Sequence, residues 1–170
     1  DVYEPGSVMK VMTVASALEK GTISRDWVYN DQGRLEIGGI VIENWDKNAY
    51  GVVDVAQILI RSLNIGATSI ALEMGTDDFY SMMRSFGIGQ PTGIDLFAEE
   101  SGILKVPGDS DWSESDLATN SFGQGVSVTP LQMATMFAAI ANDGIMRQPR
   151  IVKQIVTADG IQEAQPTTIR

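Results

Sequence analysis

The sequence predicts an α+β fold that is predominantly helical and forms one domain. Four segments carry apolar residues at helical spacing, whereas only two short segments, residues 27–45 and 151–156, alternate as strands do. The chain has 170 residues, of which 44% are hydrophobic, and this composition suffices for one core. Because the sequence contains no internal repeat and no clear linker, we assign residues 1–170 to one domain, or to a large part of one, with no second domain.

The first predicted helix covers residues 8–18 and is apolar on nearly every side. A Pro-Gly pair punctuates the chain before it, and Gly21 follows it as a C-cap. Lys10 is the only charged residue between Ser7 and Leu18. A helix with so little polar surface is expected to be central and buried.

The next segments change between strand and helix patterns. Residues 27–45 alternate between glycines and predict two short strands or a hairpin. Residues 53–74 return to helical spacing, with an interruption around residues 62–64. The following helix is predicted over residues 76–86, with its first three residues, Thr-Asp-Asp, as the N-cap region.

The last third of the chain predicts two loops, a helix and a strand. Residues 87–93 read as a turn-rich loop, and residues 99–120 as a long polar loop. A helix is expected from Thr129-Pro130 to about Ala141, because proline is favoured in the first turn. Residues 151–156 have the character of a strand.

Two absences from the composition exclude several kinds of chemistry. The chain has no histidine and no cysteine, so Ser-His-Asp triads, thiol catalysis, disulfides and Cys/His zinc sites are ruled out. A metal site would have to be built from carboxylates, and we expect neither a metal nor another cofactor. Any nucleophile would be Ser, Thr, Lys or a carboxylate, with a base other than histidine.

The charge of the chain argues against two classes of partner. Its net charge of −10 and pI near 4.3 disfavour nucleic acid and anionic lipid, which need clustered Lys and Arg. Much of the acid lies between residues 95 and 116, which we interpret as a solvated surface loop. A calcium site is the alternative there, although the EF-hand spacing is absent. The acids of this segment are Asp95, Glu99, Glu100, Asp109, Asp111, Glu114 and Asp116.

Ser7 and Lys10 form a Ser-x-x-Lys sequence at the start of the first helix. Residues three apart share a helix face, roughly 5–6 Å apart at Cβ, so the ammonium can reach the hydroxyl. The helix start favours negative charge developing at Ser7, whose own N–H can donate to an oxyanion. The apolar neighbours of Lys10 desolvate it, which lowers its pKa toward that of a base. The alternative is an N-cap serine with a lysine placed by chance.

Ser62-Leu63-Asn64 is the only Ser-x-Asn in the chain, at the predicted interruption between helices. It can present a hydroxyl that relays a proton together with an amide that holds a substrate amide. The alternative is a helix break with a local cap.

Four ordered blocks resemble the transpeptidase domain of class B penicillin-binding proteins. Residues 3–10, Tyr-Glu-Pro-Gly-Ser-Val-Met-Lys, resemble the first active-site motif of the family, and residues 62–64 resemble the second. Residues 87–96 are similar to the segment that follows the second motif. Residues 121–134, Ser-Phe-Gly-Gln-Gly-Val-Ser-Val-Thr-Pro-Leu-Gln-Met-Ala, are similar to the block that leads into a helix in this family.

The resemblance implies a parent D,D-transpeptidase of peptidoglycan synthesis. Ser7 would attack the D-alanyl-D-alanine carbonyl, Lys10 would be its general base, and Ser62 would pass the proton to the leaving amine. Asn64 would bind the stem-peptide amide and help to position Lys10. β-Lactams would acylate Ser7 as substrate mimics. Implied partners are peptidoglycan stem peptides, β-lactams and other cell-wall synthesis proteins, at the extracytoplasmic face of the bacterial cytoplasmic membrane, where the parent would be anchored.

Two further residues are candidates for binding substrate. Trp45 lies in a polar loop and would either wall the substrate groove or simply pack. Gln124, between two glycines, would either approach the site or form a structural turn.

The third motif of the family, Lys-Thr-Gly or Lys-Ser-Gly, does not occur in this sequence. Residues 20–22, Lys-Gly-Thr, have the wrong order and precede the Ser-x-Asn. We therefore expect the helical part of a transpeptidase domain of the penicillin-binding-protein and serine β-lactamase-like fold, with most of its antiparallel sheet missing. By itself it would be weak or inactive, and its exposed sheet-facing helix surface would be a homodimer surface.

Other functions remain open at this point. A β-lactam sensor, or a catalytically silent penicillin-binding scaffold, would carry the same blocks. A class D-type β-lactamase fits less well with the Gly-Gln-Gly block and the Ser-x-Asn.

Overall fold

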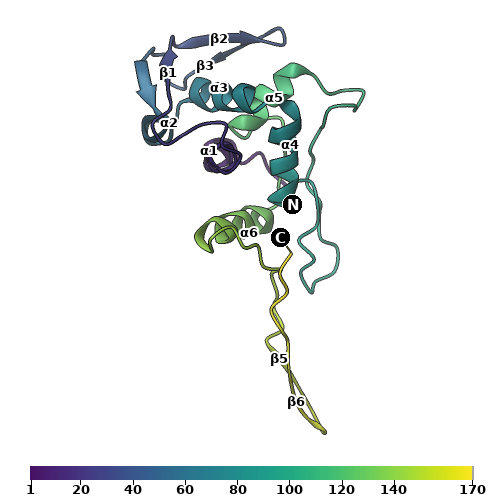
Figure 1. Cartoon of the computed structure of the whole chain (residues 1–170). Coiled ribbons are helices and arrows are strands. Elements are labelled where there is room, and N and C mark those ends of the chain that lie inside the picture. Colours follow the sequence, from purple (N-terminus) through teal and green to yellow (C-terminus); the bar gives the residue numbers. More distant parts are fainter. Residues whose placement is uncertain (170) are drawn as a thin grey trace.

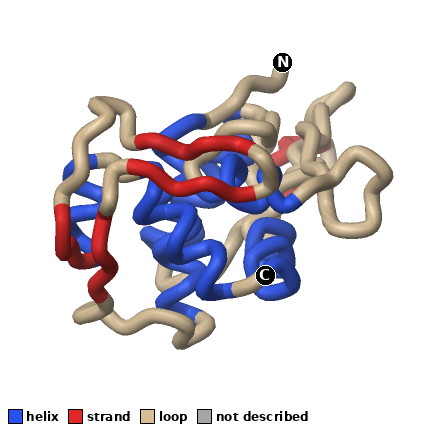
Figure 2. Tube along the Cα trace, turned by 90° about the horizontal axis from the view of Figure 1, so that it is seen from above, coloured by secondary structure: helices blue, strands red, loops and turns tan. Residues whose placement is uncertain are grey.

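The computed structural model describes residues 1–169, and it confirms an α+β fold that is mainly helical (Figure 1). Seen from above, one pair of strands lies at the left edge of the helical body and another pair crosses in front of the helices (Figure 2). In chain order the elements are η1 (Gly6–Met9), α1 (Lys10–Glu19), β1 (Val28–Asp31), β2 (Arg34–Ile37), β3 (Ile40–Glu43), β4 (Gly51–Asp54), α2 (Val55–Arg61), α3 (Asn64–Met74), α4 (Thr76–Ser85), α5 (Glu114–Ser121), α6 (Pro130–Ala141), β5 (Gln154–Thr157) and β6 (Gly160–Glu163).

Helix α1 is the central, buried helix that the sequence predicts. It packs against α2, α3 and α4, and its side chains Met12, Val14 and Ala17 belong to the main core. The polar side chains of Thr13 and Ser16 are buried as well. The Thr13 hydroxyl donates to Ser121 O at 2.7 Å, which ties α1 to the end of α5. The first helix therefore has a fixed position relative to the elements around it.

The strands form separate two-stranded antiparallel sheets within the described residues. The predicted hairpin is β2–β3, with Ile37 paired to Ile40 across a Gly-Gly turn. β1 pairs instead with β4, which lies where the sequence predicted the start of a helix at residue 53. The helix starts later because Asp54 caps α2, accepting a hydrogen bond from Gln57 N at 2.7 Å.

The predicted interruption between helices lies where expected, whereas the predicted cap of the next helix is wrong. Ser62 has left-handed dihedral angles and separates α2 from α3. α4 begins at Thr76 as predicted, but its N-cap is Gly75, and Thr76, Asp77 and Asp78 lie within the first turn. The two acids there still complement the helix dipole.

The predicted polar loop over residues 99–120 contains a helix, α5, that periodicity did not indicate. Ser113 and Asp116 form a capping box at its start. Helix α6 agrees with its prediction, with Thr129 as N-cap, Pro130 in the first turn and Gln132 completing a capping box. Gln132 Nε2 also donates to Gln90 O and Ser101 O, both at 2.8 Å, so α6 holds the preceding loop.

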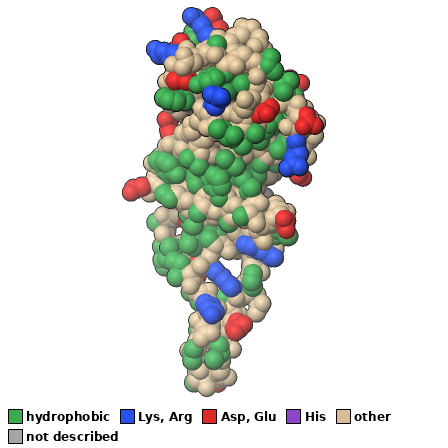
Figure 3. Space-filling model, turned by 90° about the vertical axis from the view of Figure 1, so that its left-hand side faces the viewer, with side chains coloured by type: hydrophobic (Ala, Val, Ile, Leu, Met, Phe, Trp, Pro, Cys, Tyr) green, Lys and Arg blue, Asp and Glu red, His purple; other side chains and the backbone are tan. Residues whose placement is uncertain are grey.

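The C-terminal strand prediction also needs correction. The strand covers residues 154–157 rather than 151–156, and it pairs with β6 in a hairpin that the sequence did not suggest. Both strands are fully exposed and project from the helical body (Figure 1). Hydrophobic side chains gather across the middle of one face of the molecule, above this narrow hairpin (Figure 3).

Candidate active site

The side chains of Ser7, Lys10 and Ser62 meet where η1 passes into α1 and α2 passes into α3. Lys10 Nζ lies 3.1 Å from Ser7 Oγ, 2.9 Å from Ser62 Oγ and 2.7 Å from Ser62 O. The Ser62 hydroxyl donates to Ser7 Oγ at 2.9 Å. The two short motifs, 52 residues apart, therefore form one hydrogen-bonded triangle.

These hydrogen bonds determine how Lys10 can act as a base. A protonated lysine has three N–H donors and no acceptor, and these three donors have three acceptors here. If the amine loses one proton, it can still donate to both oxygens of Ser62, while its lone pair faces Ser7 Oγ. In that state Lys10 can accept the proton of the Ser7 hydroxyl.

Burial shifts Lys10 toward that neutral state. Its side chain is 1% exposed, and desolvation lowers its pKa from 10.5 to about 8. No ion pair among residues 1–169 includes Lys10, so no carboxylate restores the ammonium form. A fall of this size raises the neutral fraction near neutral pH about 300-fold.

Two glycines bring the loop that contains Ser7 against the segment before α6. Gly6, with φ +60°, donates its N–H to Gly123 O at 2.9 Å. A Cβ on Gly123 would lie 2.2 Å from Gly6 O, so only glycine allows this approach. Tyr3 and Val128 form an antiparallel bridge just beside it. The block of residues 121–134 thus fixes the position of the residue that precedes Ser7.

The backbone of Ser62 directs both of its oxygens at Lys10. Its dihedral angles, φ 56° and ψ 49°, are left-handed, which costs a non-glycine residue about 1–2 kcal/mol. Leu63, which is fully buried, anchors the next position in the core. Conformations of this kind persist where surrounding contacts enforce them, and they cluster at functional sites.

Asn64 lies beside the triangle but is bonded elsewhere. It is the first residue of α3, is half-buried, and its Nδ2 donates to Glu43 O at 2.9 Å. This hydrogen bond joins Asn64 to the end of β3, and within residues 1–169 no hydrogen bond joins Asn64 to Lys10. The structure therefore brings three of the four predicted catalytic side chains into direct contact, with the fourth two residues along the chain.

The two predicted substrate-binding residues differ in how they relate to the triangle. The Trp45 side chain is 73% exposed, and its Nε1 donates to Arg61 O at 3.2 Å, one residue before Ser62. Gln124 is exposed in the loop that packs on Gly6, and its backbone N–H donates to Thr119 O. Trp45 thus contacts the residue before Ser62, Gln124 follows the glycine that contacts Gly6, and both are exposed to solvent.

The sequence did not indicate Asn44, whose side chain contacts the residue after the Ser-x-Asn motif, or Asp31, which contacts Asn44. Both are buried, with exposures of 2% and 1%, and they are joined by a hydrogen bond of 2.8 Å. Both residues lie within residues 27–45, where the sequence predicts two short strands or a hairpin. Nothing in their spacing indicates that β1 and β3 end beside α3.

The acidic segment shows no metal site. Within residues 1–169, no group of three or more acidic side chains is arranged to hold a metal ion. Instead, Asp95 accepts hydrogen bonds from the backbone N–H groups of Ile151 and Val152, and these bonds hold the pKa of its carboxyl below the usual range. Glu99 accepts in the same way from Thr92 and Gly93. These two carboxylates therefore serve to fix loops.

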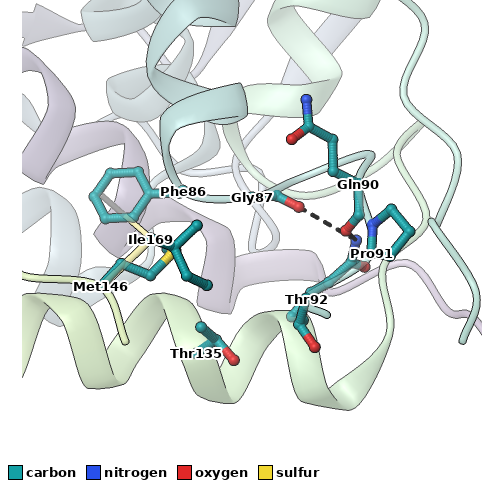
Figure 4. A pocket seen from close by; sticks show the side chains of 9 residues that line it. Phe86, Gly87, Gln90, Pro91, Thr92, Thr135, Met146 and Ile169 are labelled. Atoms are coloured by element: carbon teal, nitrogen blue, oxygen red, sulfur yellow. Dashed lines mark hydrogen bonds between the residues drawn. The ribbon is translucent and has the colours of Figure 1, made fainter. Parts of the chain in front are cut away.

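A cavity of about 80 Å³ lies between α4, the loop after it and α6 (Figure 4). Phe86, Met146 and Ile169 lie toward one end and Pro91 and Thr92 toward the other, with Thr135 between them (Figure 4). None of the predicted site residues lines it. The candidate active site is therefore the triangle of exposed Ser7 with Lys10 and Ser62 rather than this cavity. Separately, none of the helices in the described residues is long and apolar enough to cross a bilayer.

Comparisons with known proteins give the same assignment as the geometry. The family model described as "Penicillin binding protein transpeptidase domain" matches residues 1–170. Penicillin-binding protein PbpB of Mycolicibacterium smegmatis is 37% identical over 170 residues, covering 99% of this chain and 26% of that protein. Peptidoglycan D,D-transpeptidase FtsI of Escherichia coli is 37% identical over 153 residues, covering 90% of this chain and 25% of that protein.

Solved structures extend the match to three dimensions. Penicillin-binding protein 3 from Mycobacterium tuberculosis, complexed with aztreonam, superposes with a TM-score of 0.89 and 36% identity, covering 100% of this chain and 38% of that one. The chain spans about a quarter of the length of the curated relatives it matches. With its two motifs assembled around a buried lysine, and with this similarity along its whole length, the chain belongs to the penicillin-binding protein transpeptidase family.

Proposed function

We propose that this chain supplies the nucleophile, the base and the proton relay of a peptidoglycan D,D-transpeptidase. The observation that carries the proposal is the contact of buried Lys10 with Ser7 and Ser62 at 3.1 and 2.9 Å. With no histidine in the chain, a desolvated lysine is the natural base for a serine. The name of the Escherichia coli relative, a peptidoglycan D,D-transpeptidase, supports the same reaction.

The first half of the reaction forms an acyl-enzyme. Neutral Lys10 takes the proton of Ser7 as Oγ attacks the penultimate D-alanine carbonyl of a stem peptide. The N–H of Ser7, at the start of η1, donates to the oxyanion. Lys10 then passes its extra proton to Ser62 while Ser62 protonates the nitrogen of the terminal D-alanine, which leaves as a free amine.

The second half of the reaction transfers the acyl group. An amine of a second stem peptide attacks the Ser7 ester, and its proton returns through Ser62 and Lys10 to Ser7 Oγ. A new amide forms, the serine is regenerated, and no cofactor is needed. β-Lactams would stop the cycle at the ester, and the complexes of the Mycobacterium tuberculosis structure with aztreonam and ampicillin support this part of the proposal.

Three residues around the triangle would bind the stem peptide. Asn64 would hold a peptide amide, Trp45 would wall the groove with its exposed indole, and Gln124 would contact the peptide from the opposite loop. The position of Asn64 beside the triangle and the exposure of Trp45 and Gln124 support these roles. We propose in addition that Asn64 positions Lys10 indirectly, through the first turn of α3.

A transfer assay with the full-length protein tests the proposal. The donor is a stem peptide ending in D-alanyl-D-alanine, the acceptor is an amine, and the cross-linked product is measured by mass spectrometry. Ser7→Ala should abolish the product. Ser16→Ala should retain it, because Ser16 lies in the following helix α1 and contacts Met12 Sδ. A protein that acylates but transfers to no amine would instead be a β-lactam sensor, and one that does neither would be a scaffold.

The 170-residue chain alone should react slowly with penicillin. Its sequence contains no Lys-Thr-Gly or Lys-Ser-Gly to bind the substrate carboxylate and line the oxyanion site. Loss of such contacts lowers the acylation rate by about 10²–10³-fold. Rapid stoichiometric labelling of the isolated chain, measured by intact mass, would contradict this expectation.

The cellular setting follows from the proposed substrate. Peptidoglycan stem peptides place the enzyme at the extracytoplasmic face of the bacterial cytoplasmic membrane, where a membrane-anchored parent would work with other cell-wall synthesis proteins. A homodimer through exposed helix faces of this chain is a further part of the proposal, and sedimentation of the chain tests it.

A further inference from the structure

Three consecutive residues at the end of β3 hold the junction between α2 and α3 from outside. Glu43 O accepts a hydrogen bond from Asn64 Nδ2 at 2.9 Å, and Asn44 Oδ1 accepts one from Ile65 N at 3.4 Å. Trp45 Nε1 donates to Arg61 O at 3.2 Å. The three bonded positions of the junction lie on both sides of Ser62, so this segment defines the path of the chain through the Ser-x-Asn motif.

Helix α3 depends on Asn44 for a cap. Its own N-cap residue, Leu63, has an apolar side chain and makes no capping hydrogen bond. The N–H groups of a first helical turn have no acceptor within the helix. Asn44, 21 residues earlier, supplies an acceptor to Ile65 N and so performs from another segment the role that an N-cap side chain usually performs.

Asp31 fixes which way the amide of Asn44 faces. Asn44 is 2% exposed, and its Nδ2 donates to Asp31 Oδ2 at 2.8 Å and to Asn48 O at 3.0 Å. Asp31 is 1% exposed, and its other oxygen accepts from Gly33 N at 2.8 Å. A buried carboxylate needs donors, so it attracts the NH₂ group of Asn44 and leaves Oδ1 facing Ile65.

No cation pairs with Asp31 among the described residues, which distinguishes it from an ordinary structural ion pair. A buried carboxyl group without a cation beside it depends on hydrogen-bond donors, and Asp31 accepts from one backbone N–H and from the Asn44 amide, with the Tyr29 hydroxyl also nearby. The arrangement sets the orientation of one amide beside the Ser-x-Asn motif.

We propose that Asn44, oriented by Asp31, is a positioning residue for the acylation step. It holds the start of α3 so that Ser62 keeps the left-handed conformation that presents both of its oxygens to Lys10. This inference rests on the proposed function, because the geometry it protects is that of the base and the proton relay. A displacement of about 1 Å at a reacting group lowers a rate by as much as 100-fold.

The first test is the acylation of the full-length protein by a chromogenic β-lactam. Two quantities are separated: the acylation rate constant per titrated active site, and the dissociation constant of the complex that precedes it. Asn44→Ala should lower the rate constant by about 10–100-fold with little change in the dissociation constant. Asn142→Ala is the matched control, because Asn142 also donates to a loop carbonyl, Ile145 O, but lies at the end of α6.

The second test exchanges the two buried partners. Asn44→Asp places two carboxylates face to face, and Asp31→Asn places two amides there, so each single variant should acylate slowly. The double variant Asp31→Asn with Asn44→Asp restores one donor and one acceptor across the 2.8 Å contact and leaves an acceptor for Ile65 N. Its rate constant should exceed those of both single variants, without full recovery, because the exchange also removes the hydrogen bond from position 44 to Asn48 O.

The results separate this inference from the proposed function. If the unmodified protein is not acylated at Ser7, both fail. If it is acylated, and Asn44→Ala retains the rate constant per active site while only its thermal midpoint falls, Asn44 is merely structural and the inference is wrong. A double exchange variant as slow as the single variants overturns it as well. If Asn44→Ala yields no folded protein, the exchange variants carry the test, because they keep the side-chain volumes.

Discussion

The pH dependence of acylation gives a quantitative test of Lys10 as the base. In the protonated state, all three N–H donors of Lys10 are engaged by Ser7 and Ser62, so the amine must lose a proton before it can accept one. Burial lowers its pKa from 10.5 to about 8. Acylation should therefore be slow at acidic pH, rise through the pKa of Lys10 and level off above it.

The size of the rise follows from that pKa. With a value of about 8, roughly 1% of Lys10 is neutral at pH 6, about 9% at pH 7 and half at pH 8. The second-order rate constant should thus rise about tenfold from pH 6 to 7, about fivefold from pH 7 to 8, and less than about twofold from pH 8.5 to 10. A lysine with the ordinary value would keep rising about tenfold per pH unit up to about pH 10.

The assay is stopped-flow acylation of the full-length protein by a chromogenic β-lactam between pH 6 and 10. Circular dichroism at each pH checks that the protein stays folded. A profile that is flat below pH 8, or one that still rises tenfold per unit between pH 9 and 10, would refute the reasoning. The first result would remove Lys10 as a titrating base, and the second would mean that its burial does not lower its pKa.

Two further predictions concern stability. The pKa of Lys10 is lower in the folded state than in the unfolded state, so the unfolded state binds the proton more tightly. The free energy of unfolding should therefore rise by about 3 kcal/mol between about pH 8 and 10.5. In chemical denaturation Lys10→Met should lack this rise, and an equal rise in both proteins would contradict the assignment. Gly123→Ala would bring a Cβ to 2.2 Å from Gly6 O, whereas Gly144, also at φ +81°, has open space. The Gly123 variant should lose about 1–3 kcal/mol more than Gly144→Ala, and most of its acylation, with equal losses speaking against the close approach.

The contact between Ser7 and Lys10 could be predicted from the sequence, because the Ser-x-x-Lys motif carries its own local geometry. Ser7 and Lys10 share a helix face by spacing alone, and the apolar neighbours of Lys10 indicate its burial. That Ser62 would meet them came only from the family resemblance, since no local rule places residues 52 apart in contact. The burial of α1 follows from its composition, whereas the contact of Ser62 with Ser7 and Lys10 depends on tertiary packing.

The elements that the sequence missed have weak local signals. Helix α5 buries only Leu117 and Ala118 among its apolar side chains, and its polar residues read as a loop. The strand β4 continues directly into α2, and the predicted helical segment, which starts at residue 53, therefore includes Val53 of the strand. In both cases a polar cap, Ser113 or Asp54, marks the helix start more reliably than periodicity does.

The supporting contacts of the site are the least predictable part. Asn44 caps a helix that begins 20 residues later, and only the folded chain shows that the end of β3 reaches it. Gly123 is required by the backbone of Gly6, which belongs to a segment more than a hundred residues away. Such contacts depend on how the helices and strands pack together, and no periodicity in a single sequence indicates that packing.

The site of covalent modification by penicillin tests most directly whether Ser7 is the nucleophile. The full-length protein is incubated with benzylpenicillin, digested and mapped by mass spectrometry. If Ser7 is the nucleophile and Lys10 its base, one adduct forms, on the peptide that contains Ser7, and none forms in Ser7→Ala or Lys10→Met. An adduct on another residue, or an undiminished adduct when Lys10 is replaced, would contradict these assignments.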